Sequence, residues 1–313
     1  MAIPTNVVET FDRVGIREDL TDIISNISPT ETPFQSAVSS GSAKGTFHEW
    51  QTDALAAAAD NKAVEGAIAV AEARGATTRL GNYTQIADKV IAVTGSDQAA
   101  DNAGRSQEMA YQVAKAGLEI KRDMETTLVG TNKARAAGSS GTARELAPVL
   151  SWIATNESKA GDGATPTGDG TDARTDGTQR TFTEAMLTAV IDATWLSGGN
   201  PTTIMCNSTQ KRVITGFTGN AGTKFKNVDD KTIVNAVDVY EGDYGALMVV
   251  PNRFMRQREV FLIEPDMWSV DYYRPFQTKD LAVTGDSVSK QMLAEYTLCS
   301  KQEAANGIIA DLS

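Results

Sequence analysis

The clearest pattern of apolar and polar positions lies between residues 106 and 130. Apolar side chains recur there at steps of three and four residues, which is the spacing of one face of an α-helix. They are Met109, Val113, Ala116, Ile120, Met124 and Thr127 or Leu128. Ser106 can cap the first turn, and Gly130 can end the last turn in a left-handed conformation. The pattern predicts a helix roughly 35 Å long, which suits a building element of an assembly or an ordinary surface helix.

Two segments before this helix alternate with period two, as half-buried β-strands do. They cover residues 46–52 and 83–94. The intervening residues 54–74 are rich in alanine and contain few bulky side chains, so they bury little by themselves. We therefore expect a long projecting hairpin with 83–94 as its returning strand, because long segments of this kind are usually functional or disordered.

The chain after the long helix predicts a body of mixed helices and strands. Residues 158–180 contain almost no apolar side chain, which indicates a flexible surface loop. Thr181 and Glu184 form a capping-box pattern that opens a helix through Leu196. The further predicted elements are strands at 202–206, 247–250 and 260–263, a helix at 208–216 and an alternating strand at 292–298. The predicted fold class is α+β.

Residues 1–40 are predicted to form an arm. Large apolar side chains from Glu9 to Asn26 are interleaved with charged ones, which suits a short helix or a strap lying across another surface. Pro29 and Pro33 then bias the chain toward extended forms. Because the arm has little partner surface of its own, we expect it to pack on the body of the same chain or on a neighbouring subunit.

The amino-acid composition limits the classes of protein to which the chain can belong. The chain has 313 residues, 41% of them hydrophobic and 22% charged, which is typical of a soluble globular protein with about two domains. Its apolar runs are too short to cross a bilayer, and its first residues lack the features of a secretory signal. Cys206 and Cys299 form no CxxC motif and are expected to be buried, reduced thiols, which indicates synthesis inside a cell.

The net charge of −11 argues against a dedicated nucleic-acid binder, because such proteins neutralise phosphates with Lys and Arg. The same charge is compatible with a container wall that leaves packaged DNA mobile. Acidity also favours solubility in general, so charge alone does not choose between these interpretations.

Residue types for catalysis or metal binding are scarce. His48 is the single histidine, which excludes HExxH and multi-histidine metal sites, and no GxSxG surrounds any serine. The glycine-rich stretches at 161–163 and 216–224 match neither a dinucleotide fingerprint nor a phosphate loop. We predict no catalytic, cofactor-binding or metal-binding residue, and a structural or solvent-exposed role for His48.

Two clusters leave an alternative open. An acidic cluster could in principle gather calcium but matches no EF-hand, so we favour a solvated acidic loop. Its members are Asp162, Asp169, Asp172 and Asp176. An aromatic cluster could stack on bases, but its period-two placement favours packing within a sheet. Its members are Trp268, Tyr272, Tyr273 and Phe276.

Three segments near the N-terminus carry a more specific pattern. They are Phe11-Asp12-Arg13-Val14-Gly15-Ile16-Arg17-Glu18-Asp19-Leu20-Thr21-Asp22-Ile23-Ile24, Ser28-Pro29-Thr30-Glu31-Thr32-Pro33-Phe34 and His48-Glu49-Trp50-Gln51-Thr52-Asp53. Together with the order of arm, hairpin, long helix, mixed body and returning strands, they resemble the major head proteins of tailed bacteriophages, which have the Hong Kong 97 fold. The resemblance is specific over residues 1–130 and rests on layout beyond them.

The resemblance implies a phage major capsid fold divided into five parts. They are an N-terminal arm at 1–40, an extended β-hairpin loop at 41–95, a peripheral domain with a spine helix at 96–144, an axial domain at 145–265, and return strands of the peripheral domain at 266–313. The arm and the loop would reach neighbouring subunits. The candidate intersubunit contacts are Phe11, Ile16, Phe34, Phe47 and Trp50.

The implied function is that of a major capsid protein, which self-assembles through hexamers and pentamers into an icosahedral virion shell around the phage genome. Synthesis and assembly would take place in the host cytoplasm. Scaffolding, portal and decoration proteins would be further partners, with double-stranded DNA adjacent but not specifically bound, and with no membrane or cofactor. The alternatives are a soluble enzyme with an unrecognised site in 145–265, or another virion subunit such as a tail-tube or decoration protein.

Overall fold

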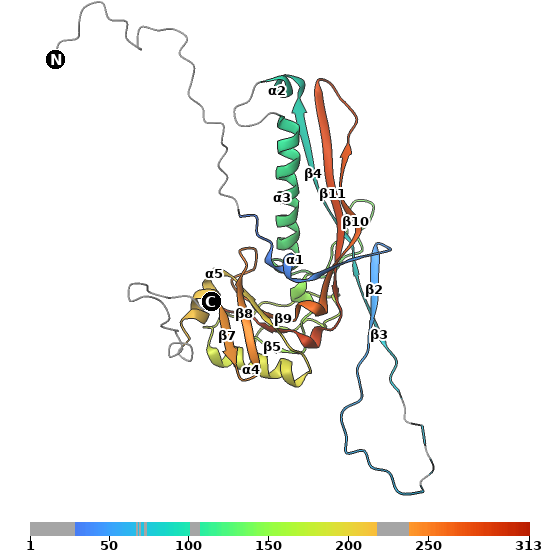
Figure 1. Cartoon of the computed structure of the whole chain (residues 1–313), viewed down its shortest axis with the longest axis vertical. Coiled ribbons are helices and arrows are strands. Elements are labelled where there is room, and N and C mark those ends of the chain that lie inside the picture. Colours follow the sequence, from blue (N-terminus) through green and yellow to red (C-terminus); the bar gives the residue numbers. More distant parts are fainter. Residues whose placement is uncertain (1–28, 67, 69, 72–73, 101–106, 218–237) are drawn as a thin grey trace, which may run out of the picture.

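The computed structural model describes residues 29–66, 68, 70–71, 74–100, 107–217 and 238–313 (Figure 1). Within these residues the chain forms a four-stranded sheet beside a long helix, a six-stranded sheet with shorter helices, and a separate two-stranded ribbon. This arrangement confirms the predicted α+β class. The candidate contacts Phe11 and Ile16, and the predicted helix cap Ser106, lie outside the described residues.

The four-stranded sheet has the order β1-β10-β11-β4. Its strands are β1 (Ser39–Ser42), β10 (Trp268–Asp280), β11 (Ser287–Ser300) and β4 (Gln85–Thr94). β10 and β11 form a long antiparallel hairpin in which Val270 lies opposite Leu298. β4 pairs antiparallel with β11, and β1 adds a short parallel edge to β10. Segments from both halves of the sequence therefore share one sheet (Figure 1).

The predicted long helix is α3 (Glu108–Val129), which packs along β4 and β11 (Figure 1). Most of its predicted apolar stripe is buried, whereas Val113 is half-buried. The buried members are Met109, Ala116, Ile120, Met124 and Leu128. Gly130 ends the helix at φ −104°, so the predicted left-handed closing turn was wrong. A Cβ at Gly130 would overlap the carbonyl oxygen of Phe254, so close approach of two backbone segments is what requires glycine there.

The six-stranded sheet has the order β5-β12-β9-β6-β8-β7. Its strands are β5 (Glu157–Ser158), β12 (Gly307–Ile309), β9 (Val260–Ile263), β6 (Thr203–Cys206), β8 (Gly245–Pro251) and β7 (Val239–Gly242). The helix α4 (Glu184–Leu196) packs on β12 and β5, and α5 (Ser208–Thr215) packs on β8. These elements confirm the predicted strands at 202–206, 247–250 and 260–263 and the predicted helix at 208–216.

Two details of this region differ from the prediction. The N-cap of α4 is Thr183 and makes no side-chain cap bond, so the expected capping box of Thr181 and Glu184 does not open the helix. The chain beyond β11 does not stay with the four-stranded sheet, because β12 pairs with β9 and β5. Residues 266–313 are therefore divided between both sheets instead of returning to one.

The ribbon pairs β2 (Phe47–Thr52) with β3 (Thr78–Tyr83), from Phe47 opposite Tyr83 to Thr52 opposite Thr78. The segment between these strands projects away from the two sheets (Figure 1). The prediction of a hairpin is confirmed, but the predicted returning strand at 83–94 was wrong. That segment is β4 and pairs with β11, because the chain changes partner at the buried Thr84, whose hydroxyl donates to Glu295 at 2.6 Å.

The remaining short helices flank these sheets. They are α1 (Pro33–Ala37), α2 (Gly95–Ala99), and three 3-10 turns, η2 (Val149–Ser151), η3 (Pro265–Met267) and η4 (Glu303–Ala305). The Thr94 hydroxyl caps α2 by accepting a bond from the Asp97 N–H at 3.4 Å. The helix α2 therefore directly continues β4 at the outer end of the four-stranded sheet (Figure 1).

Buried apolar side chains form two clusters, which lie on opposite faces of the six-stranded sheet. Phe261 and Ile263 of β9 belong to the first cluster, while Val260 and Leu262 belong to the second. Alternate residues of a strand point to opposite faces, so one strand contributes to both. The first cluster also contains Trp268 and the inner end of α3, and it therefore joins the two sheets into one packed body.

Candidate intersubunit surface

The base of the ribbon is held by aromatic contacts with its own subunit. Phe47 packs against Tyr83, with ring centroids 4.6 Å apart, and the Arg135 guanidinium lies over the Phe47 ring at 5.2 Å. Trp50 packs against the fully buried Trp152, with centroids 5.3 Å apart. Phe47 and Trp50 are thus half-buried anchors of the ribbon, and their contact with a neighbour remains a prediction for the parts that stay exposed.

Polar side chains strengthen the same junction. Asn82 is fully buried and donates to the carbonyl oxygens of Ala147 and Leu298 at 3.1 and 2.9 Å, while its own side-chain oxygen accepts from the Ala147 N–H at 2.9 Å. His48 on β2 lies 3.1 Å from Asp271 on β10. The base of the ribbon is therefore bonded to the 146–153 region and to the long sheet hairpin at the same time.

Glu295 is a buried carboxylate at this junction that binds three side chains. Its buried carboxylate accepts from Arg144 at 2.5 Å and from Arg274 at 2.6 Å, in addition to Thr84. Burial alone would raise the pKa of Glu295, but the hydrogen bonds of Thr84 and Arg274 and the two arginine charges outweigh it and place the pKa below its ordinary value. The residue is ionised and fixes the point where the chain leaves the ribbon for β4.

Beyond the base, the described residues from 53 to 77 are all exposed. The large apolar side chains among them are almost fully open to solvent: Leu55 is 98% exposed, Val64 80%, Ile68 90% and Val70 85%. The ion pair of Lys62 with Asp60 is local to the segment. These four apolar side chains are not covered by any described part of the subunit.

The start of the described chain behaves differently. Phe34 in α1 is 0% exposed and packs edge-on against Trp268 at 6.3 Å. The buried Glu125 of α3 accepts bonds from the backbone N–H groups of Phe34 and Gln35, at 2.7 and 3.1 Å, and so satisfies the open N-terminus of α1. Phe34 has no surface left to offer a neighbour, so its prediction as an intersubunit contact is corrected to a role in the subunit core.

A second exposed apolar area lies at the end of α4 and was not predicted from the sequence. Trp195 at the end of α4 stacks on Tyr244 in the β7–β8 turn, with centroids 5.0 Å apart, and both rings are partly open to solvent. Leu196 beside them is 70% exposed. The signal available in the sequence was an adjacent Trp and Leu at a helix end, but the partner Tyr244 is distant in sequence and only the fold brings it near.

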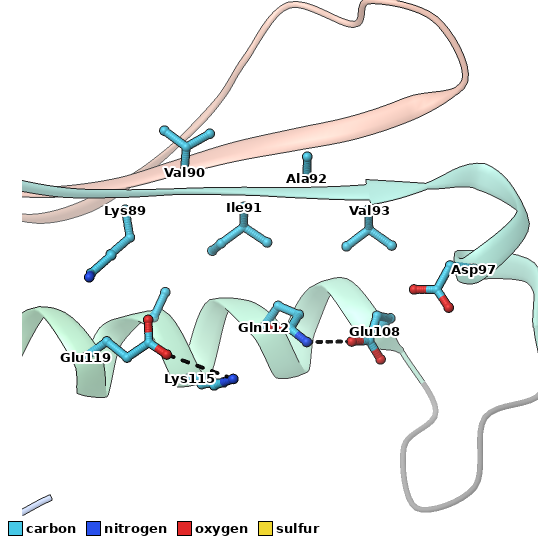
Figure 2. Close-up of a pocket in the computed structure, with 11 residues that line it drawn as sticks. Lys89, Val90, Ile91, Ala92, Val93, Asp97, Glu108, Gln112, Lys115 and Glu119 are labelled. Atoms are coloured by element: carbon cyan, nitrogen blue, oxygen red, sulfur yellow. Dashed lines mark hydrogen bonds and ion pairs between the residues drawn. The ribbon is translucent and has the colours of Figure 1, made fainter. Parts of the chain in front are cut away.

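A cavity of about 370 Å³ lies between α3 and β4 (Figure 2). Lys89, Ile91 and Val93 of β4 point toward the helix, and Lys115 lies 3.9 Å from Glu119 on the helix itself. Charges of both signs at helical spacing neutralise one another there. The lining is therefore mixed, with apolar side chains from β4 and charged side chains from both elements.

The acidic loop has partners within the chain in place of calcium. Asp162 accepts from the Thr178 N–H at 2.9 Å and from the Thr178 hydroxyl at 2.5 Å, which lowers the pKa of Asp162. Asp169 and Asp172 accept from Thr167, and Asp176 pairs with Arg256. Arg174, itself only 3% exposed, donates to Glu157 and to the Ile153 carbonyl. The loop lies mostly at the surface, as predicted, but its hydrogen bonds and its buried Arg174 attach it to the body.

The aromatic cluster is divided between the core and the surface. Trp268 is fully buried and Tyr272 is half-buried, whereas Tyr273 is 39% exposed and Phe276 37%. All four lie on the long strand β10, as the period-two pattern predicted. None of the described helices combines the length and hydropathy needed to span a membrane.

Solved structures with this arrangement include phage capsid chains. A chain of the cyanophage A-1(L) capsid asymmetric unit matches with a TM-score of 0.68 at 12% identity and covers 99% of each chain. A chain from Gordonia phage Cozz matches with a TM-score of 0.61 at 10% identity, covering 99% of this chain and 97% of that one. The fold is therefore that of phage capsid proteins of the Hong Kong 97 type.

Sequence comparison narrows the class to one family. The chain belongs to the SU10 major capsid protein family, which it matches over residues 3–313. It is similar to the major capsid protein of Escherichia phage Phieco32, with 27% identity over 344 residues, covering 99% of this chain and 97% of that protein. The protein is therefore a structural component of the virion that assembles with copies of itself, and not an enzyme. This family membership confirms the prediction of a major capsid protein over the alternatives of an enzyme, a tail-tube subunit or a decoration protein.

Proposed function

We propose that this subunit forms hexamers and pentamers that close into an icosahedral head shell around the phage genome. The observation that carries the proposal is the segment from 53 to 77, whose described residues are exposed, apolar in part, and firmly anchored at the base of the ribbon. A rigid base with an uncovered extension is suited to clasping an adjacent subunit. Many such contacts, each modest, give a stable closed lattice.

The two sheets support a division of the chain into a peripheral and an axial domain. The peripheral domain would consist of the four-stranded sheet with α3, and the axial domain of the six-stranded sheet with α4 and α5. Because β12 lies in the six-stranded sheet, we add the residues after β11 to the axial domain originally expected at 145–265. The exposed pair Trp195 and Tyr244 then lies on the axial domain, where it is available to sister subunits.

Further partners follow from the same role. Scaffolding, portal and decoration proteins would attach to the shell, and double-stranded DNA would lie against its inner wall. The net charge of −11 supports contact with DNA that is close but not tight, because a strongly basic lining would hold the polymer in place. Synthesis and assembly would take place in the host cytoplasm.

The test is to replace residues 54–76 with a short Gly-containing turn. Thr52 and Thr78 are paired neighbours at the end of the ribbon, so a turn can connect the strands without disturbing its base. We expect a folded subunit that forms no closed shells in electron microscopy. A control in which 54–76 becomes a Gly/Ser segment of the same length separates lost contacts from lost length. Normal shells from the shortened chain would refute the assigned role of the hairpin.

A further inference from the structure

Three potential metal ligands meet where the ribbon contacts the four-stranded sheet. His48 comes from β2, Asp271 from β10 and Cys299 from β11. Cys299 lies opposite Ser269, two positions from Asp271 on β10, so the thiol and the carboxylate share one face of the sheet. His48 Nε2 lies 3.1 Å from Asp271 Oδ2, and one ligand atom from each of the three residues lies within 4.8 Å of the others.

We propose that His48, Asp271 and Cys299 bind one divalent cation of the zinc class and so fasten the ribbon to the sheet. Zinc takes imidazole nitrogen, thiolate sulfur and carboxylate oxygen at about 2.0–2.3 Å in tetrahedral geometry, which places neighbouring ligand atoms roughly 3.3 Å apart. The separation of 3.1 Å between His48 and Asp271 is close to that value. The mixed set of nitrogen, sulfur and oxygen donors suits zinc or cobalt, whereas magnesium and calcium prefer oxygen alone.

The surroundings are those of a built site. Asp271 and Cys299 are each 5% exposed, while the His48 side chain is 21% exposed and leaves a path for a cation to enter. Ser269 Oγ donates to Asp271 Oδ2 at 3.2 Å and so orients the carboxylate, as partners of metal ligands commonly do. A Cβ at Gly41 on β1 would overlap Asp271 Oδ1, so the missing side chain makes room for the carboxylate.

The thiol distinguishes this site from a simple hydrogen-bonded pair. His48 and Asp271 can bond to each other without any help from Cys299. Cys299 is 5% exposed, and zinc takes a cysteine only as the thiolate, so the thiol proton has to leave when a cation binds. Binding of the cation displaces this proton to solvent and forms the metal–sulfur bond. The thiolate then becomes the ligand that ties β11 to β2.

A metal here would act within one subunit. It would bond the first strand of the ribbon to both strands of the long sheet hairpin at the base of the ribbon, where His48 is paired with Asn82. The cation would therefore stabilise the direction in which the hairpin leaves the body, in addition to the aromatic and polar contacts already described. This inference does not depend on which neighbour the hairpin contacts.

The test uses the purified full chain, stripped of metal with a chelator and then dialysed against zinc or cobalt. We expect about one metal ion per chain by elemental analysis, a thiolate-to-cobalt charge-transfer absorption, and a higher melting temperature with zinc. H48Q and C299S should each weaken zinc binding more than about tenfold, because even the loss of a partner of a ligand costs about 10–100-fold. C206S removes the other buried thiol and should bind as the unchanged protein does.

Each result decides the question. If C299S does not fold, H48Q serves alone, because His48 is the most exposed of the three residues and can lose its imidazole with the least effect on the core. Absence of stoichiometric zinc in the unchanged chain would overturn the proposal. Equal binding by the unchanged protein and H48Q would also overturn it, and would leave His48 and Asp271 as a hydrogen-bonded pair only.

Discussion

Two segments poor in large apolar residues have opposite structures. The described residues between 53 and 77 are all exposed, whereas the segment at 158–180 folds against the body and buries Pro166, Gly168, Gly170 and Arg174. The sequence predicted a projecting hairpin for the first segment and a flexible surface loop for the second, because both contain few bulky apolar side chains. The difference shows that composition does not determine whether such a segment is packed.

Partners elsewhere in the chain make the difference. In the packed segment, Arg174 bonds to Glu157 and to the Ile153 carbonyl, and Asp311 accepts from the backbone N–H groups of Ala160 and Gly177. In the projecting segment, Lys62 pairs only with the nearby Asp60. Hydrogen bonds can therefore replace apolar burial where acceptors and donors converge, whereas the described residues of the projecting segment stay exposed.

The largest effect on stability is expected from Arg174→Met. Removing the guanidinium leaves the half-buried Glu157 without its main partner and the Ile153 carbonyl unsatisfied, at a cost of about 3–5 kcal/mol in the free energy of unfolding. Urea unfolding of the unassembled subunit measures it. Lys62→Met is the matched control in the projecting segment, and its exposed ion pair should contribute less than about 1 kcal/mol. Equal losses for both variants would remove the distinction between the two segments.

A smaller loss, about 1.5–3 kcal/mol, is expected from Asp311→Asn. Asp311 has a φ of 61°, which asparagine tolerates, so the backbone is preserved while the charge is lost. The variant weakens the bonds from Ala160, Gly177 and Arg258 that hold the loop on the C-terminal residues. The measurement is again urea unfolding, and hydrogen exchange should show faster opening at 160–177. An unchanged exchange rate there would show that the loop is held by other contacts.

A pH effect is expected from Glu259, which is 1% exposed. Burial, together with the charge of Asp176 on the loop, raises its pKa from 4.5 to about 7 against the pull of Arg256. The folded state then binds more protons than the unfolded state between these values, so stability falls as pH rises from about 4.5 to about 7. The slope should stay below about 1.4 kcal/mol per pH unit.

Glu259→Gln should remove the fall in stability between pH 4.5 and about 7. Asp176→Asn should move this fall to lower pH, because it removes a negative charge that raises the pKa of Glu259. Urea unfolding at a series of pH values between 4 and 8 tests both. A curve of the unchanged protein that rises across this range would show that Glu259 is not the group that titrates.

The smallest effect on stability is expected for Leu55→Ser combined with Val70→Ser. Both side chains are exposed in the subunit, at 98% and 85%, so the free energy of unfolding should change by less than about 0.5 kcal/mol. Shell yield in electron microscopy should nevertheless fall, because these side chains are proposed to be covered by a neighbour. Full yield with unchanged stability would show that the apolar side chains of the segment are not contacts.

The sequence predicted the elements with strong local periodicity. The stripe from Met109 to Leu128 gave the long helix, and apolar runs such as Val260–Ile263 gave central strands, because burial of one face leaves a repeat along the chain. The prediction from sequence failed where the structure depends on which strand is the pairing partner. Residues 85–94 have the alternation of a strand, but nothing local states that β11 and not β2 is their partner.

For the candidate surface, the sequence located the hairpin, but it did not separate anchors from exposed residues. Phe34, Phe47 and Trp50 are equally large and apolar in the sequence, yet Phe34 is in the core and the other two hold the base of the ribbon. The cluster of His48, Asp271 and Cys299 joins residues far apart in the chain, and no spacing rule could have collected them.

The sequence by itself thus determined the class of fold, the long helix and the presence of an apolar-poor hairpin, since these depend on periodicity and composition within one segment. Only the tertiary structure decided which polar segment is packed, which strand joins which sheet, and which aromatic side chains remain accessible. Those outcomes depend on hydrogen bonds such as Arg174 to Glu157 and Thr84 to Glu295. These bonds contribute to stability only after folding has brought the two residues of each pair together.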